Sequence, residues 1–224
     1  MIKQKDFNFK SKEVSDVFNN HVRHHAPFYD IATSLLTSIV KNFSFNNMKI
    51  LDLGCGKGNV SKMLSEQVNK KLDITNVDYS KDMLKDFIGS GKIINNDIIN
   101  YVDKNEQKFD CIISFLTMHF IHPKKRVELI NNIIDLVDEK GIFIMLEKFY
   151  QEDAISSFIS KDVYYLEKIK SISNKEAYEK LVSLIGVLYP FTEDEVCKYG
   201  DFNNFYRFDF FRYLDFVGIV FMRK

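Results

Sequence analysis

The feature that most constrains the fold is the segment ILDLGCGKGNV, residues 50–60. Its first residues are apolar, as in a strand buried on both faces of a sheet. Three glycines follow at alternate positions, Gly54, Gly56 and Gly58, and glycine is favoured where the backbone takes positive φ values or lies against a ligand. The segment predicts a strand over Met48–Leu53, a glycine-rich turn and a helix over residues 58–68. This arrangement places a ligand beside the N–H groups of a helix terminus.

The glycine spacing distinguishes this turn from a dinucleotide-binding one. From Asp52 onward the segment reads D-x-G-x-G-x-G, whereas dinucleotide sites have G-x-G-x-x-G. A glycine-rich turn without a ligand is the alternative interpretation.

Composition narrows the class of protein. The 224 residues carry 31 basic and 31 acidic side chains, so the chain lacks the broad positive field with which proteins hold long nucleic acids. No apolar run is long enough to predict a membrane span, and the N-terminus lacks the apolar core of a signal peptide. Cys55, Cys111 and Cys197 match no metal-binding spacing. We expect a cytoplasmic protein that contacts no membrane and holds no metal.

The segment after the first helix predicts a second strand, Lys71–Val77, which leads directly into Asp78. A carboxylate at this place can accept hydrogen bonds from both hydroxyls of a ribose. The separation between Gly56 and Asp78 is close to the value of about 20 residues that such sites have. A turn aspartate without a ligand is the alternative.

Strands and helices continue to alternate along the chain. Further strands are predicted at Gly91–Asn96, Phe109–Leu116 and Ile142–Leu146, with an amphipathic helix at Lys124–Val137. Short connections of this kind give a parallel sheet with helices on both faces. Two runs of β-forming residues on either side of Leu214 predict a C-terminal antiparallel hairpin. The fold class is therefore α/β, a Rossmann-like sheet of seven strands, five parallel and two in the hairpin.

Helices are also predicted outside this core. Two of them span Ser11–Asn20 and residues 27–42, and in the second Ile31, Leu35, Ile39 and Phe43 recur at core spacing. Two more, Gln151–Ile172 and Asn174–Leu188, precede the hairpin. We expect a single domain in which residues 1–46 form a helical cap, residues 47–150 the cofactor-binding core, and residues 151–224 the last helices and the hairpin.

At residues 52–58 the sequence resembles motif I of the class I S-adenosylmethionine-dependent methyltransferases. The resemblance implies S-adenosylmethionine as the cofactor. It also implies that the acidic residue after the third strand holds the adenine amino group, together with the backbone of its neighbour. The expected cofactor-binding residues are Tyr29, Asp52, Gly54, Cys55, Gly56, Asp78, Tyr79, Asp97, Ile98 and Ser114.

Histidines supply the candidates for catalysis. His119 lies in the loop after the fourth strand, and ligands of open α/β sheets bind outside the carboxyl ends of the strands. His24 and His25 precede the first strand, in a segment that often covers the cofactor in this fold. His119 and His25 are therefore the candidate bases, which are needed only if the nucleophile must lose a proton. A structural role is the alternative for each.

Three further segments, Ala26–Asp30, Met118–Arg126 and Glu147–Asp153, resemble the carboxy-S-adenosylmethionine synthase branch of this superfamily. That resemblance implies transfer of a carboxylate from prephenate to the methyl carbon of S-adenosylmethionine. The branch typically has a polar amide where this chain has Ser114, and an arginine where residues 193–200 offer only Lys198. A lysine cannot reproduce the bidentate fork of an arginine on a carboxylate.

We therefore expect methyl transfer from S-adenosylmethionine to a small-molecule acceptor, in a protein for which a homodimer is conceivable. One alternative is the synthase reaction, which Arg207 or Arg212 could support by reaching back into the site. The other is a cofactor-binding but inactive partner subunit.

Overall fold

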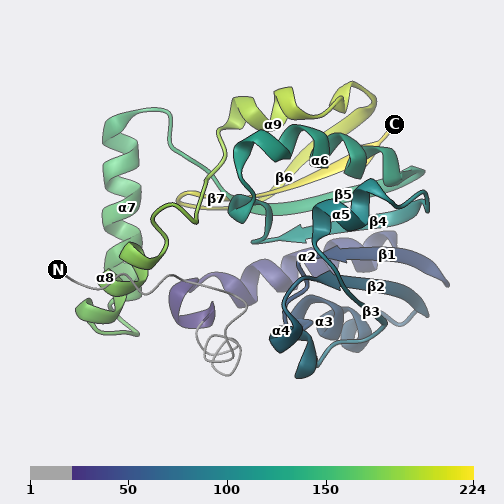
Figure 1. The fold of residues 1–224 in the computed structure, drawn as a ribbon, viewed down its shortest axis with the longest axis horizontal. Coiled ribbons are helices and arrows are strands. Elements are labelled where there is room, and N and C mark those ends of the chain that lie inside the picture. Colours follow the sequence, from purple (N-terminus) through teal and green to yellow (C-terminus); the bar gives the residue numbers. More distant parts are fainter. Residues whose placement is uncertain (1–21) are drawn as a thin grey trace.

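The computed structural model describes residues 22–224, apart from the side chains of Cys197 and Tyr199. Within these residues seven strands form one sheet in the order β3-β2-β1-β4-β5-β7-β6 (Figure 1). The strands are β1 (Met48–Leu53), β2 (Leu72–Asp78), β3 (Lys92–Asn95), β4 (Phe109–Phe115), β5 (Val137–Lys148), β6 (Phe205–Tyr213) and β7 (Phe216–Arg223). The first five strands are parallel, and β7 is antiparallel to both β5 and β6. This confirms the predicted α/β class and the C-terminal hairpin.

Helices cover both faces of the sheet (Figure 1). One face packs against α2 (Tyr29–Phe43) and α3 (Asn59–Gln67), the other against α5 (Ile98–Asp103), α6 (Pro123–Leu136) and α9 (Glu193–Tyr199). The short α4 (Lys81–Lys85) follows β2. In β4, Ile112 faces one half of the core while Cys111 and Ile113 face the other. A central parallel strand buried on both faces requires such a continuous apolar run.

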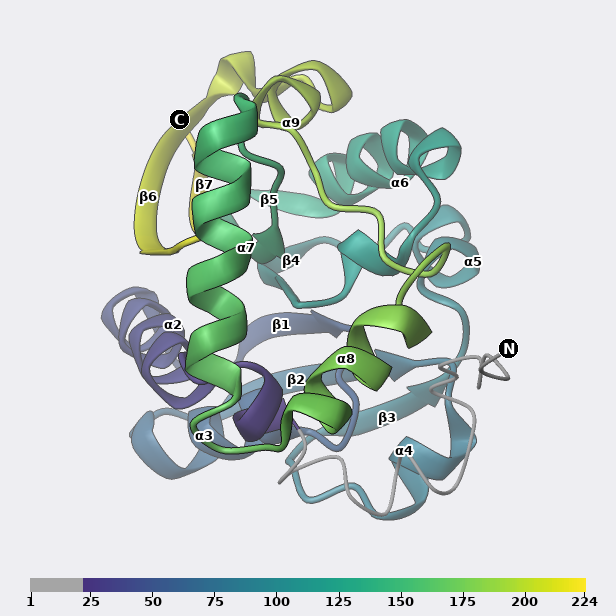
Figure 2. The ribbon, with the colours of Figure 1, turned by 90° about the vertical axis from the view of Figure 1, so that its left-hand side faces the viewer.

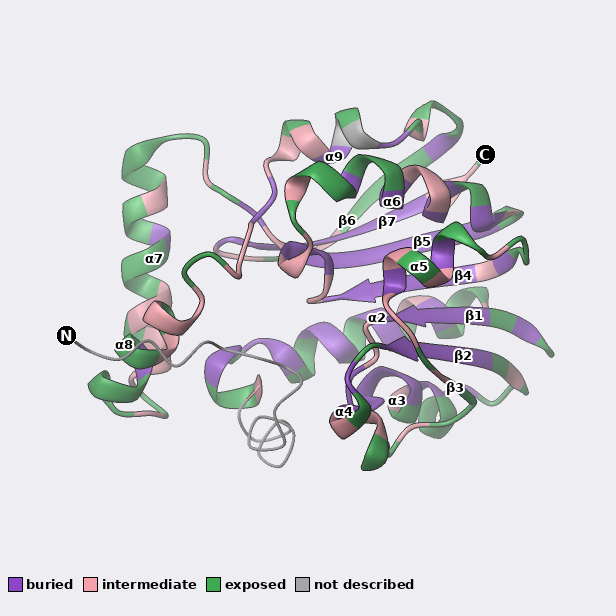
Figure 3. Cartoon of the chain, viewed as in Figure 1, coloured by how far each residue is buried: buried purple, intermediate pink, exposed green. Residues whose placement is uncertain are grey.

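Two helices stand apart from the sheet. Figures 1 and 2 show α7 (Ala154–Lys168) and α8 (Asn174–Ser183) beyond the carboxyl ends of the parallel strands, and in Figure 3 their surfaces are mostly exposed. The helix predicted from Gln151 begins later, at Ala154. The side chain of Asp153 caps this start by accepting the N–H of Ser156 at 2.8 Å. No helix in residues 22–224 is long and apolar enough to cross a membrane.

The predicted core face of α2 is wrong. Ile31, Leu35 and Phe43 are 64%, 40% and 39% exposed, whereas Leu36 and Val40 are fully buried. The buried face contains threonines, so its sequence pattern is not apolar. The hydroxyl of Thr33 donates to the carbonyl of Tyr29 at 2.7 Å, and that of Thr37 to the carbonyl of Thr33 at 2.8 Å. A polar group satisfied within its own helix can be buried at little cost. The helix predicted at residues 11–20 lies outside the described part of the chain.

Arg126 of α6 joins two segments that frame the strand ends. Its side chain is fully buried. Its Nε donates to the carbonyl of Ile121 at 2.9 Å, an Nη donates to the carbonyl of Tyr189, and its guanidinium lies 4.0 Å from the ring centroid of Phe191. The guanidinium thus links the β4–α6 loop to the segment between α8 and α9.

Replacing this guanidinium should weaken the fold. We expect Arg126→Met to lower the free energy of unfolding by roughly 2–5 kcal/mol, because buried carbonyls lose their donors. Lys125→Met, at the exposed neighbouring position, should change it by no more than about 0.5 kcal/mol. Urea denaturation of both variants measures the difference, and equal stabilities would contradict this role of Arg126.

Candidate active site

A cavity of about 870 Å³ lies between the carboxyl ends of the parallel strands and the two separate helices. Its walls come from β1, β2, β4 and β5, from the segment before α2, and from α7 and α8. Figure 2 shows how these elements are arranged. All but one of the predicted site residues line it: His25, Tyr29, Asp52, Gly54, Cys55, Gly56, Asp78, Tyr79, Asp97, Ile98 and His119. Ser114 does not.

The glycine turn after β1 has the conformation that its sequence predicts. Gly54, Gly56 and Gly58 have φ values of 73°, 54° and 82°, in the region that favours glycine. A Cβ on Gly54 would lie only 2.3 Å from the side chain of Thr117. The N–H of Gly56 donates to the carboxylate of Asp78 at 2.9 Å. The turn is therefore clamped between the loop after β4 and the end of β2.

Carboxylates gather at one end of the cavity. Asp52 is buried, and its Oδ2 has no hydrogen-bond partner among the described residues. Burial, and then the nearby Asp78, raise the pKa of Asp52 to about 7. Burial also raises the pKa of Asp78, although its carboxylate accepts the N–H groups of Ser80 and Gly56. Asp97 caps α5 by accepting the N–H of Ile99 at 2.9 Å.

Aromatic and small side chains complete this acidic end. The hydroxyl of Tyr29 accepts a hydrogen bond from Asn59 at 3.1 Å, and its ring packs edge-on against Phe115. Burial raises the pKa of Tyr29 to about 12 and also raises the pKa of the Cys55 thiol. Neither group is therefore ionised near neutral pH. Among residues 22–224 no cluster of three or more side chains could hold a metal ion.

Glu147, at the end of β5, organises the loop that follows β4. Its side chain is fully buried. One carboxylate oxygen accepts the hydroxyl of Ser114 at 2.7 Å and the N–H groups of Thr117 and Met118 at 3.2 and 3.0 Å. The other accepts the N–H of His119 at 3.2 Å. Ser114 therefore supports the loop from beneath the cavity.

The two candidate histidines differ in their surroundings. Nδ1 of His119 lies 2.6 Å from a carboxylate oxygen of Glu147 and 3.3 Å from the N–H of Lys148. Glu147 therefore fixes the orientation of the His119 ring through Nδ1. His25 is buried in the cavity wall, and its backbone carbonyl accepts the hydroxyl of Tyr164. His24 is exposed and lies outside the cavity lining.

The opposite end of the cavity is basic. Lys148 of β5, Lys161 and Lys168 of α7, and Lys180 of α8 line it. Burial lowers the pKa of Lys148. Burial and the nearby Lys148 lower the pKa of Lys168 to about 8, and burial and the nearby Lys168 lower that of Lys180 to about 7. These four lysines form the basic end, which also contains Asp215, 3.8 Å from Lys148. Asp52, Asp78 and Asp97 form the acidic end.

The two arginines of the hairpin do not reach this cavity. Arg207 and Arg212 each pair with Glu193, at 2.8 and 2.7 Å, and Arg207 also pairs with Asp209. Lys198 pairs with Asp194 at the surface. No arginine is found among the described residues that line the cavity. The idea that Arg207 or Arg212 reaches back into the site is therefore wrong.

Sequence reasoning missed the organising role of Glu147 and the lysines of α7 and α8. A usable signal existed for Glu147: it stands near the carboxyl end of a buried apolar strand, as Asp78 stands at the end of β2. The three lysines of α7 and α8 gave no such signal, because lysines on a helix usually lie on its solvated face.

Comparison with known proteins agrees with this geometry. The family profile of a methyltransferase domain matches residues 50–141. The fold resembles that of the plantazolicin methyltransferase BpumL in complex with S-adenosylhomocysteine, with a TM-score of 0.68, 14% identity and coverage of 96% of this chain and 93% of the other. It also resembles magnesium protoporphyrin IX methyltransferase from Synechocystis PCC 6803, with a TM-score of 0.66, 13% identity and 96% coverage of both chains. The fold and the glycine turn define an S-adenosylmethionine-dependent methyltransferase of class I.

Relatives in sequence identify the family within this class. The carboxy-S-adenosyl-L-methionine synthase of Nautilia profundicola is 34% identical over 202 residues, which cover 86% of this chain and 83% of that protein. The synthase of Campylobacter lari is 31% identical over 198 residues, with 86% and 83% coverage. The chain belongs to the carboxy-S-adenosyl-L-methionine synthase family.

The raised pKa of Asp52 makes stability depend on pH. A carboxyl group whose pKa is about 7 in the folded chain and 3.8 otherwise contributes stability at low pH that is lost as pH rises from about 4 to about 7. Asp52→Asn removes this loss. From about pH 5 to about pH 8, the free energy of unfolding of the variant should rise by roughly 2–3 kcal/mol relative to that of the unliganded wild type. Chemical denaturation at the two pH values measures it, and parallel pH profiles would contradict the buried, unpaired state of Asp52.

Proposed function

We propose that this protein transfers the methyl group of S-adenosylmethionine to a small-molecule acceptor in the cytoplasm. The observation that carries the proposal is the distribution of charge in one cavity, with Asp52, Asp78 and Asp97 at the ends of the strands and three lysines on α7 and α8. S-adenosylmethionine carries positive charge on its sulfonium and its ammonium, so the acidic end suits it. The remaining volume beside α7 and α8 is left for the acceptor.

We assign cofactor binding to the acidic end. Asp52 offers a buried carboxylate oxygen without a partner among the described residues, which suits an ammonium group. Asp78 with Tyr79 suits the ribose, Asp97 with Ile98 suits the adenine, and the backbone of Gly54, Cys55 and Gly56 suits the close approach of the cofactor. Tyr29 covers this end. When bound, S-adenosylmethionine supplies a methyl group activated by the sulfonium charge. Ser114 acts through Glu147 and not by contact.

His119 is the proposed base where the acceptor must lose a proton. Its Nδ1 is held by Glu147 at 2.6 Å, the arrangement in which a carboxylate orients an imidazole base. It lines the cavity at the loop after β4. His25 is the second candidate because its ring is buried in the same wall.

Carboxylate transfer from prephenate is the second candidate function. The relatives named as synthases favour it. The arginine content of the cavity weighs against it, since Arg207 and Arg212 are held by Glu193 and lysines make only single-point contacts with a carboxylate.

One experiment separates the two functions. Purified protein is incubated with S-adenosylmethionine and prephenate, and the products are analysed by mass spectrometry. We expect no phenylpyruvate above the uncatalysed background, and S-adenosylhomocysteine as the nucleoside retained on purification. Sustained, equimolar formation of phenylpyruvate and a carboxylated cofactor would overturn methyl transfer and establish the synthase reaction.

A homodimer through α7 and α8 is also proposed. An apolar stripe of side chains that are more than 45% exposed lies outside the cavity lining: Ile155, Phe158, Ile159 and Leu166 of α7, with Tyr178 of α8. The spacing of the α7 residues places them on one face of that helix, and monomeric proteins rarely expose large contiguous apolar surfaces.

Light scattering tests the dimer. The wild type should have twice the 26.3 kDa of the chain, and Phe158→Glu should be monomeric because it places charge in the apolar stripe. Phe45→Glu, at a 49% exposed phenylalanine remote from α7, is the control and should remain dimeric. A monomeric wild type would refute the proposal.

A further inference from the structure

Asp52 is buried beside a second carboxyl group and lacks the partners that would stabilise its own charge. It is 2% exposed, and its Oδ2 accepts no hydrogen bond from the described residues. Asp78, at the end of the neighbouring strand β2, accepts the N–H groups of Gly56 and Ser80 at 2.9 and 2.8 Å. When two nearby carboxyl groups resist ionising together, the one that accepts hydrogen bonds ionises more readily. The geometry therefore leaves a proton on Asp52 when no ligand is bound.

Among the described residues, no positive side chain offsets this arrangement. Burial and the nearby Asp78 together raise the pKa of Asp52, and no cation lowers it. Arg23 lies 5.7 Å from the ring centroid of Tyr29 but pairs with Asp30 at 3.0 Å. The other titratable groups that face Asp52 from the neighbouring elements are all acids: Tyr29 of α2, Cys55 of the glycine turn and Cys111 of β4.

The ligand expected in the cavity carries the missing positive charge. Asp52 lines this cavity together with the glycine turn. S-adenosylmethionine and S-adenosylhomocysteine both have an α-amino group, whose usual pKa of about 8 keeps it charged at neutral pH. An opposite charge within about 4–6 Å favours the ionised form of a carboxyl group. The cofactor's ammonium group would thus make Asp52 lose its proton.

We propose that the unliganded protein holds a proton on Asp52 and releases it when the ammonium group of the cofactor binds. This inference rests on the proposed function for the cofactor site, because it takes Asp52 to meet the amino-acid end of S-adenosylmethionine. On binding, the O–H bond of the carboxyl group breaks, the proton passes to the solvent, and a carboxylate–ammonium pair forms. The affinity for the cofactor is therefore coupled to pH.

The direction of this coupling follows from the two states of Asp52. Its pKa is about 7 in the unliganded chain and lower in the complex, so below neutral pH the unliganded form holds more protons than the complex. At about pH 6, about 0.9 proton should be released for each cofactor bound. From about pH 7 to about pH 5.5, the affinity for S-adenosylhomocysteine should fall about tenfold.

Calorimetry with two nucleosides tests the proposal without turnover. S-adenosylhomocysteine has the ammonium group, whereas 5′-methylthioadenosine has the same adenosine and sulfur but lacks the amino-acid part. Each is titrated at about pH 6 in phosphate and in imidazole buffer, because the different ionisation enthalpies of the buffers report the protons released. S-adenosylhomocysteine should release about 0.9 proton and 5′-methylthioadenosine less than about 0.3. Equal heats for S-adenosylhomocysteine in the two buffers, or equal release by both nucleosides, would overturn the proposal.

Two variants locate the proton. Asp52→Asn keeps the shape of the side chain but cannot ionise, so S-adenosylhomocysteine should release less than about 0.2 proton from it at about pH 6. Asp97→Asn removes another carboxylate of the acidic end and can still cap α5, so it should release as much as the wild type. Release from Asp52→Asn equal to that of the wild type would overturn the proposal.

The same titrations separate this inference from the proposed function. If neither nucleoside binds to the wild type, the cofactor site is refuted and the inference with it. If S-adenosylhomocysteine binds with an affinity that does not change with pH, the inference alone is refuted. Neither result depends on methyl transfer.

Discussion

The position of the loop after β4, Thr117–His119, depends on the buried carboxylate of Glu147. It accepts hydrogen bonds from three consecutive backbone N–H groups, of Thr117, Met118 and His119, and from the hydroxyl of Ser114. A fully buried carboxylate is stable only with such partners. Because Thr117 in turn packs against Gly54, the carboxylate at the end of β5 also sets the space available to the glycine turn after β1. The turn and the loop after β4 are therefore positioned together.

The cavity beside this loop has acidic side chains on one side and lysines on the other. Strand ends contribute Asp52 and Asp78 on one side, while α7 and the end of β5 contribute Lys168 and Lys148 on the other. The first side comes from the part of the fold that the family profile matches. The second comes largely from helices added beyond the carboxyl ends of the strands. Under the proposed function, the strand ends bind the cofactor and these helices select the acceptor, so membership of the synthase family does not by itself determine the reaction.

The acidic side of the site could be predicted because its signals are local. Asp52, Gly54 and Gly56 lie within one turn, and Asp78 ends the next strand, so spacing alone brings them together. The role of Glu147 depends on partners about 30 residues earlier in the chain, and no short-range pattern reports such a contact. The wrong face of α2 has another cause: Thr33 and Thr37 satisfy their hydroxyls within the helix, so polar residues occupy the buried stripe. The basic end was missed because the lysines of α7 belong to a helix with little buried surface.

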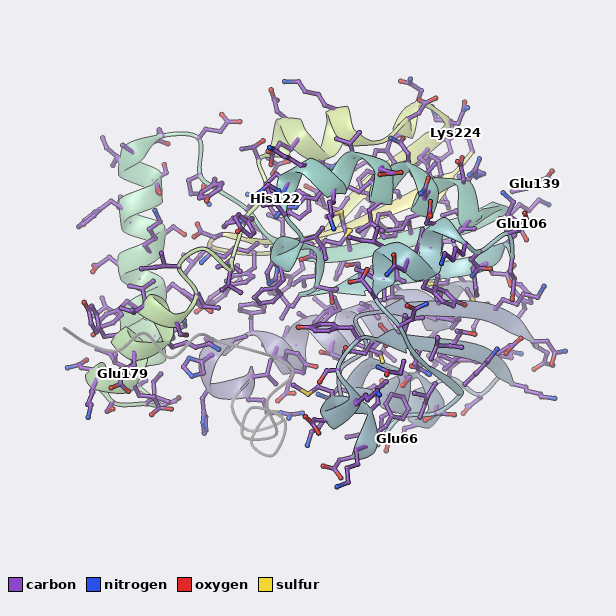
Figure 4. The ribbon with its side chains drawn as sticks, viewed as in Figure 1. Glu66, Glu106, His122, Glu139, Glu179 and Lys224 are labelled. Atoms are coloured by element: carbon purple, nitrogen blue, oxygen red, sulfur yellow. The ribbon has the colours of Figure 1, made fainter. Side chains whose placement is uncertain are left out.

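The measurement that tests this account most directly is calorimetry of S-adenosylhomocysteine binding to Glu147→Gln. The amide would present a donor where the carboxylate now meets only donors, so the loop at Thr117–His119 should shift and the glycine turn with it. Glu139→Gln, at the exposed start of the same strand (Figure 4), is the matched control. The account predicts that Glu147→Gln binds at least about tenfold more weakly while the control binds as the wild type does. A folded Glu147→Gln variant with unchanged affinity would contradict the account.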